Sequence, residues 1–153
     1  MVRENLREAF DGAPGTSSWC MGNGPGAGIL GTLRPLSAEE ASQVPPGGGS
    51  TIAAHAEHLR WSLVRSRAYF KNEATKGNWV DSWRISQVSG REWNRLRLDL
   101  EAEYRGLLEN LAAYEGPVTL DFTRGVFGIV THAVYHLGAI RQLATTLRRV
   151  PKH

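Results

Sequence analysis

Apolar residues recur at helical spacing along three long segments of the chain. Residues 52–72 contain no helix-breaking residue, and their apolar positions repeat about every 3.6 residues. Residues 89–116 carry a sustained apolar face, and residues 126–149 carry another. Because this period gathers apolar side chains on one side of a helix, we predict three long amphipathic helices.

The N-terminal part of the chain predicts a short helix followed by a long loop. Residues 2–10 form a brief apolar stripe that ends at Gly12. Residues 12–28 are rich in Gly, Pro and Ser and show no periodicity. Long loops in compact domains usually have a function, so we consider this segment a candidate wall or lid for a site.

Two further short helical pieces are predicted before the first long helix. Residues 29–36 have helical spacing that is interrupted at Pro35. Ser37 and Glu40 then form a capping-box pattern, in which each side chain satisfies a backbone N–H at a helix N-terminus. These pieces and the N-terminal stripe together predict a shorter, broken helix beside the three long ones.

The connections between the long helices have less regular patterns. Residues 76–89 are too irregular for one element, and we interpret them as a connection that packs its aromatic rings on the helices. Ser89 and Glu92 form a second capping box at the start of the next helix. Residues 118–122 alternate apolar and polar side chains, which is compatible with a brief extended connection before the last helix at 126–149.

These patterns predict an all-α protein that folds as an antiparallel four-helix bundle. The 153 residues suit one domain, which we expect to span the whole of 1–153. No pair of strands with a hairpin turn is evident in the sequence. In helix bundles, ligand and metal sites are built from polar side chains on facing helices.

The charge pattern argues against a nucleic-acid partner. The net charge is only +3, and the basic residues are scattered along the helical segments. The densest group, Arg141, Arg148, Arg149 and Lys152, lies where cations favourably meet the C-terminus of a helix. We interpret these four as solvated cations.

The single cysteine and the absence of a long apolar run favour a cytoplasmic protein. Cys20 cannot form an internal disulfide, and nothing adjacent to it would activate the thiol, so we expect it to be inert. No window approaches the roughly 20 apolar residues that a membrane span needs. We therefore expect neither a membrane partner nor a signal peptide.

Four of the five histidines fall in two pairs, and this pairing suggests a metal site. His132 and His136 are four residues apart on the last predicted helix, so their imidazoles can converge on one ion. Burying two imidazoles in an apolar helix without partners would cost a few kcal/mol. The alternative is a pair of histidines that are hydrogen-bonded in the core or lie at a dimer boundary.

The residues around His132 and His136 exclude one class of zinc enzyme but do not identify a third metal ligand. Ala133 occupies the position at which a zinc protease of the H-E-x-x-H type carries its glutamate, so that class is excluded. A third histidine would come from residues 52–72, which offer His55 and His58. Three ligands leave a position free for catalysis, whereas a structural zinc site needs four.

The two histidine segments, TIAAHAEHLRWSL and GIVTHAVYHLGAIRQ, resemble the motifs of the DinB/YfiT-like superfamily of metal-dependent enzymes. The resemblance covers roughly residues 29–148. It implies that the first ligand is His58, which precedes the aliphatic Leu59. It also implies that His132 and His136, ahead of Gly138, are the other two ligands. The three-residue spacing from His58 makes His55 a supporting group, a pocket residue or a core histidine.

The resemblance further implies a nickel- or zinc-binding bundle, and relatives include thiol transferases, isomerases and amidase-like hydrolases. We therefore expect one divalent ion, zinc or nickel, held by His58, His132 and His136. The substrate would be a small molecule, with a low-molecular-weight thiol as a candidate. The alternative is a non-enzymatic homodimer whose metal is structural or incidental. We interpret Glu57, Tyr135 and Arg141 as solvated or structural.

Overall fold

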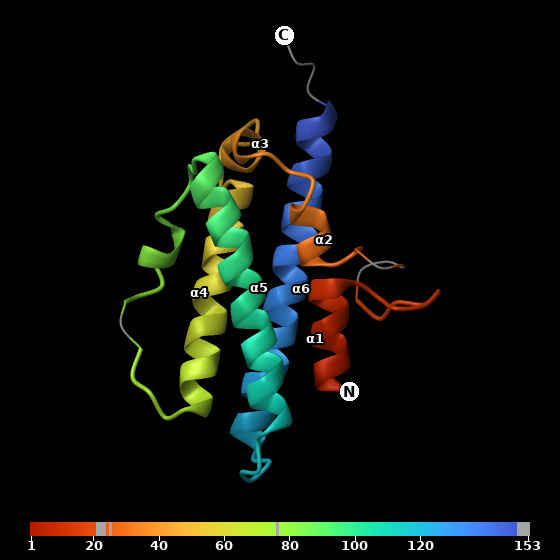
Figure 1. The fold of residues 1–153 in the computed structure, drawn as a ribbon, viewed down its shortest axis with the longest axis vertical. Coiled ribbons are helices and arrows are strands. Elements are labelled where there is room, and N and C mark those ends of the chain that lie inside the picture. The colour runs from red at the N-terminus through yellow and green to blue at the C-terminus, as the bar shows by residue number, and fades with distance from the viewer. Residues whose placement is uncertain (21–23, 25, 76, 150–153) are drawn as a thin grey trace.

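The computed structural model describes residues 1–20, 24, 26–75 and 77–149 as an all-helical protein (Figure 1). This part of the chain contains no strand, so the predicted all-α class is confirmed. Its elements in chain order are α1 (Val2–Asp11), α2 (Ile29–Leu33), α3 (Ala38–Ser42), α4 (Ile52–Phe70), the short 3-10 helix η1 (Asp81–Trp83), α5 (Gly90–Ala112) and α6 (Leu120–Arg149).

The three long helices lie side by side, and two short ones complete the bundle. Helices α4, α5 and α6 run along the long axis of the molecule, while α1 and α2 follow one another along α6 (Figure 1). Both short helices pack on α5 and α6. The predicted broken N-terminal helix is therefore the fourth member of the bundle, interrupted by the loop at 12–28.

Helices α4 and α5 are parallel neighbours, which a fully antiparallel bundle would not contain. The Thr51 hydroxyl donates to the Ser86 carbonyl (2.8 Å) just before both helices begin. Near the other end, Arg67 Nη1 lies 2.8 Å from Glu103 Oε2. The connection at 71–89 returns along the bundle (Figure 1), which is possible because an extended residue spans about twice the length of a helical one.

The predicted capping boxes are present at two helix starts. The Glu40 backbone N–H donates to Ser37 Oγ (3.1 Å), and the Ser37 N–H donates to the Glu40 carboxylate (2.9 Å). Ser89 and Glu92 form the same pair of hydrogen bonds at the start of α5. These local bonds satisfy N–H groups that have no partner within the helix.

The last helix begins earlier than predicted, so the expected extended connection at 118–122 was wrong. Helix α6 starts at Leu120, and the Thr119 hydroxyl accepts a hydrogen bond from the Phe122 N–H (3.1 Å). Asp121 lies in the first turn, where a carboxylate is favoured by the helix dipole. The alternating pattern resembled a strand, but the threonine cap and the acidic first turn stabilise a helix over these residues.

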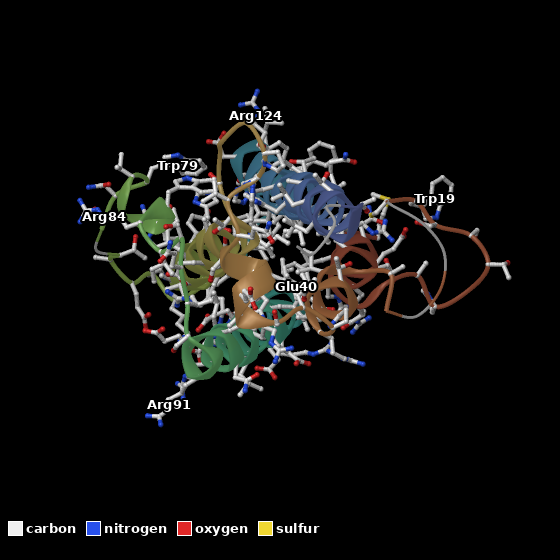
Figure 2. All side chains as sticks on the ribbon, turned by 90° about the horizontal axis from the view of Figure 1, so that it is seen from above. Trp19, Glu40, Trp79, Arg84, Arg91 and Arg124 are labelled. Carbon is white, nitrogen blue, oxygen red and sulfur yellow. The ribbon has the colours of Figure 1, made fainter. Side chains whose placement is uncertain are left out.

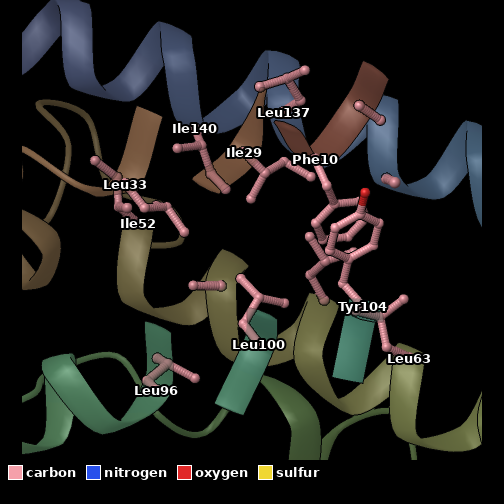
Figure 3. Close-up of a cluster of buried hydrophobic side chains, with 14 of the residues drawn as sticks. Phe10, Ile29, Leu33, Ile52, Leu63, Leu96, Leu100, Tyr104, Leu137 and Ile140 are labelled. Atoms are coloured by element: carbon pink, nitrogen blue, oxygen red, sulfur yellow. The ribbon is translucent and has the colours of Figure 1, made fainter. Parts of the chain in front are cut away.

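The core lies between α1, α4, α5 and α6 and joins the broken helix to the long ones (Figure 3). The rings of Phe10 and Tyr104 stack with centroids 4.3 Å apart. Trp93 Nε1 donates to the Leu36 carbonyl (2.8 Å), so even the buried indole N–H is satisfied. The largest fully buried apolar side chains also include Leu6, Ile29, Leu33, Ile52, Leu59, Leu63, Leu100, Leu107, Leu137 and Ile140.

The described part of the 12–28 loop is attached to α1. The Glu8 carboxylate accepts hydrogen bonds from the Ser18 hydroxyl and from the Cys20 backbone N–H, the latter at 2.7 Å. Trp19 is 91% exposed and projects on the side of the bundle opposite Trp79 (Figure 2). The described loop therefore does not form a wall of the histidine site discussed below, contrary to our expectation.

The predicted cation group near the C-terminus lies only partly within the described residues. The side chains of Arg148 and Arg149, and the whole of Lys152, lie outside the described residues, so the predicted C-terminal cation group is not tested. Within the described part of the chain, none of the helices combines the length and apolar character that a membrane span requires.

Candidate metal centre

Helices α4 and α6 bring all three predicted site residues together. His58 lies on α4, while His132 and His136 occupy successive turns of α6. His132 Nε2 is 3.2 Å from His58 Nε2 and 2.9 Å from His136 Nε2. His58 is thus brought to two histidines that lie 74 or more positions away in sequence, and the ligand atoms of all three lie within 4.8 Å of one another.

The interior position of these imidazoles keeps them neutral. His58 is fully buried and His136 is 1% exposed, whereas His132 is half-buried. Burial, followed by the neighbouring His132 and His55, lowers the pKa of His58 to about 4. Burial and the surrounding histidines lower the pKa of His136 to about 3. Neutral imidazole is the form that binds a metal, so the unligated site already has the required protonation state.

Ser82 determines which nitrogen of His58 carries the proton. The Ser82 hydroxyl donates to the Trp79 carbonyl (2.6 Å), which uses its only proton. His58 Nδ1 lies 2.6 Å from Ser82 Oγ and must therefore be the donor in that hydrogen bond. The proton then resides on Nδ1, and the Nε2 lone pair is directed at His132. Such an outer hydrogen bond is typical of histidines that ligate metals.

His55 plays the corresponding role behind His136. The two Nδ1 atoms are 2.9 Å apart, a distance at which one must donate to the other. If His136 Nδ1 is the donor, its Nε2 lone pair is free to face His132, and His55 accepts. The histidine spacing alone left open whether His55 or His58 joins the α6 pair, and the family resemblance implied His58. The structure places His58 with the pair and His55 one layer behind.

The three Nε2 atoms are spaced as ligands of one ion would be. Two nitrogens bound tetrahedrally to zinc at about 2.0–2.1 Å are about 3.3 Å apart, close to the separations of His132 from its two neighbours. Without an ion, a single proton on His132 Nε2 would have to serve both neighbouring lone pairs. The residues present therefore fit a divalent metal that imidazole nitrogen suits, such as zinc or nickel.

Two tryptophans from the α4–α5 connection shield the site. The Trp83 ring stacks on His58 with centroids 4.1 Å apart and 15° between the planes. Trp79 meets the same imidazole edge-on at 4.2 Å and is itself 56% exposed. The predicted packing of aromatic rings from this connection is confirmed, and its location shows that the connection forms the wall of the histidine cluster.

Other polar residues that the sequence drew attention to lie outside the cluster. The Glu57 carboxylate accepts two hydrogen bonds from Arg60, both 2.7 Å, which supports its structural interpretation. The Tyr135 ring packs edge-on against His136 but is 65% exposed. Burial and the Glu8 carboxylate raise the pKa of the Cys20 thiol, which agrees with the expected inert cysteine.

Sequence reasoning missed Ser82, the residue that orients His58. It lies in the irregular connection, where no helical period indicates which side chains turn inward. The local signal was a serine between two tryptophans four residues apart, Trp79 and Trp83. Its partner His58 is 24 residues away in the sequence, so only the folded chain reveals the contact.

The fold and the cluster define a helical bundle with a three-histidine group suited to a metal ion. The family profile of the DinB superfamily matches residues 27–140, which is well over half of the chain. The chain therefore belongs to the DinB superfamily, as the two histidine segments predicted. Comparisons with curated proteins and with solved structures gave no match.

Proposed function

We propose that this protein binds one divalent ion, zinc or nickel, through His58, His132 and His136 and acts as a metal-dependent enzyme of the thiol-transferase or hydrolase type. The observation that carries the proposal is the convergence of three Nε2 atoms, with His132 Nε2 at 3.2 and 2.9 Å from the other two. Membership of the DinB superfamily supports the same assignment.

The chain's own residues prepare the site for such chemistry. Ser82 holds the proton of His58 on its outer nitrogen, and His55 does the same for His136 when it accepts from His136 Nδ1, so that both Nε2 lone pairs remain available. Trp83 covers one face of His58 and excludes water from it. A divalent ion bound here supplies Lewis acidity, which promotes loss of a proton from a water or thiol ligand near neutral pH.

The number of ligands favours catalysis over a structural role. A structural zinc site is normally closed by four protein ligands. Among the described residues, the cluster suited to a metal contains three histidines, and the nearest further imidazole, His55, faces His136 from behind. His132 is the half-buried member, so access for a small substrate is expected on its side of the cluster.

The test is elemental analysis of the purified protein after expression with metal supplied. We expect about one equivalent in the wild type and a loss of most of it in His132→Ala. His55→Ala is the matched control, because it removes an imidazole from the same pocket without removing a proposed ligand. Absence of metal from the wild type, or full retention in His132→Ala, would refute the proposed site.

The second candidate is a non-enzymatic homodimer, and one observation favours it. Phe127 and Tyr135 on α6 are 67% and 65% exposed and lie about two helical turns apart, so they can contribute to one apolar surface patch. A dimer would bury them, and mutation of either to a charged residue would halve the mass in solution. Metal-dependent turnover of a thiol or amide substrate by the monomeric variants would then assign the activity to a single chain.

A further inference from the structure

A pocket lies along α4 and α6 beyond the histidine cluster. It has a volume of about 260 Å³ and is lined by Ser66, Tyr69 and Phe70 of α4 and by residues of the first turns of α6, among them Phe122, Val126 and Ile129. Phe70 and Ile129 of its lining pack against the core, and none of the three clustered histidines lines it.

Two aromatic rings of the lining, Phe70 and Phe122, pack with Tyr114, which lies outside the lining. The rings of Tyr114 and Phe122 stack with centroids 4.2 Å apart. Phe70 meets both of them edge-on, at 5.7 and 6.1 Å. Because these contacts form within the chain alone, the pocket is preformed, which lowers the cost of binding a ligand.

The pocket offers no charge that a ligand would need to match. Asp121 is the only ionisable side chain in the lining apart from Tyr69, and it lies 3.5 Å from Arg124. The Asp121 side chain is also 92% exposed, so it is solvated at the rim. An uncharged apolar group is therefore the chemistry that the interior of the pocket suits.

Two glycines in α6 leave this side of the helix open. Glycine weakens a helix relative to alanine, yet a Cβ atom added at Gly125 or Gly128 would meet no other atom within 4 Å. Packing within the chain therefore does not require glycine at either position. Gly125 lines the pocket, and Gly128 lies between it and His132. Both glycines are exposed, so at these two positions no side chain covers the surface of α6 between the pocket and His132.

The pocket and the metal site lie along the same pair of helices. Gly125 precedes His132 by two helical turns, and Tyr69 follows His58 by about three, so each pair is on one face of its helix. Two turns correspond to about 10 Å. A small molecule of ordinary length can therefore reach from the pocket to the histidines.

We propose that this pocket binds an uncharged aromatic or alicyclic group at the far end of the substrate, whose reacting end lies at His58, His132 and His136. The proposal rests on the proposed function, because it assigns the substrate class of the same site. The substrate would be a thiol or an amide separated from its ring by a linker that spans about 10 Å.

The first test examines the pocket without reference to the metal. Toluene is titrated into the full-length, metal-free protein, and backbone amide signals are followed by NMR. We expect saturable shifts centred on Gly125, Val126 and Ile129. Gly125→Leu, which places a side chain in the pocket, should abolish them. Thr123→Leu is the control, because it adds the same side chain at an exposed position of α6 that does not line the pocket.

The second test measures whether one thiol ligand occupies the pocket and the metal site at the same time. Phenylhexanethiol, hexanethiol and benzyl mercaptan are titrated into the cobalt-loaded protein, and the near-ultraviolet thiolate-to-cobalt band reports binding. Phenylhexanethiol should bind at least about tenfold more tightly than the other two, which corresponds to about 1.4 kcal/mol. Gly125→Leu should remove this gain, and Thr123→Leu should retain it.

Each failure has a different meaning. Absence of toluene shifts, or equal affinities for the three thiols, would overturn the proposal. Absence of the thiolate band together with normal toluene shifts would overturn the proposed function but retain the pocket as a binding site. The wild type could also show no toluene shifts while the Gly125→Leu variant differs from it in oligomeric mass in solution. This result would overturn the proposal and identify a second copy of the chain as the occupant of the pocket.

Discussion

His58 Nδ1 lies 2.6 Å from Ser82 Oγ, and this contact couples the α4–α5 connection to the histidine cluster. Ser82 is only 2% exposed, and its hydroxyl donates a hydrogen bond to the Trp79 carbonyl. The connection therefore does more than return the chain to the start of α5. It determines the orientation and the tautomer of the one proposed ligand that comes from α4.

Replacing Ser82 should weaken metal binding without removing a ligand. In Ser82→Ala the buried Nδ1–H of His58 loses its acceptor, and we expect the metal affinity to fall roughly ten- to a hundredfold. Competition with a chromophoric chelator measures this change. Ser62→Ala is the matched control, because that serine also lies on this side of the bundle but donates to the Leu59 carbonyl. Equal affinities in the two variants would contradict the orienting role.

His55 should support the site as a hydrogen-bond acceptor rather than as a ligand. We expect His55→Ala to retain about one equivalent of metal but with an affinity lowered roughly tenfold or more, since His136 Nδ1 loses its partner. His55→Gln, whose amide oxygen can accept the same hydrogen bond, should recover part of the loss. The measurement is metal stoichiometry combined with chelator competition. Complete loss of metal from His55→Gln would instead identify His55 as a ligand.

The metal-free protein should lose stability as the pH falls below 6.5. The pKa of His58 is lowered from 6.5 to about 4 and that of His136 to about 3. Between these values the unfolded chain takes up protons that the folded chain does not, so the free energy of unfolding decreases with falling pH. We expect a loss on the order of a few kcal/mol between pH 7 and pH 4.

Urea denaturation at a series of pH values measures this dependence. The double variant His58→Gln/His136→Gln removes the two histidines whose pKa values are lowered most and should show a much shallower decline across the same range. A decline as steep as that of the wild type would assign the effect to other groups. The comparison requires metal-free protein, because a bound ion competes with protons for the same nitrogens.

The corrected start of α6 predicts a measurable contribution from Thr119. Its hydroxyl caps the helix by accepting from the Phe122 N–H (3.1 Å), so Thr119→Ala should reduce the free energy of unfolding by about 1 kcal/mol. The Thr123 hydroxyl only donates to the Thr119 carbonyl within the helix, which makes Thr123→Ala the control with little expected effect. Chemical denaturation compares the two. A neutral Thr119→Ala variant would place the helix start elsewhere.

Much of the fold could be predicted because its signals are local. The capping boxes of Ser37 with Glu40 and of Ser89 with Glu92 involve residues three positions apart, and both form as expected. The start of α6 was missed for a local reason as well, because the alternation at 118–122 was interpreted as extended and the cap at Thr119 was not recognised. By contrast, the parallel direction of α4 and α5 depends on how a long irregular connection returns, and no local pattern encodes that path.

The sequence by itself determined that the chain is helical and that His132 and His136 share one face of the last helix, because a period of about 3.6 residues is a property of neighbouring positions. It also supplied the family resemblance that selected His58. Only the tertiary structure decided that His58 meets that pair, that His55 stands behind it and that Ser82 orients it. These contacts join residues that are 24 to 81 positions apart in sequence, and such residues come into contact only when the helices pack.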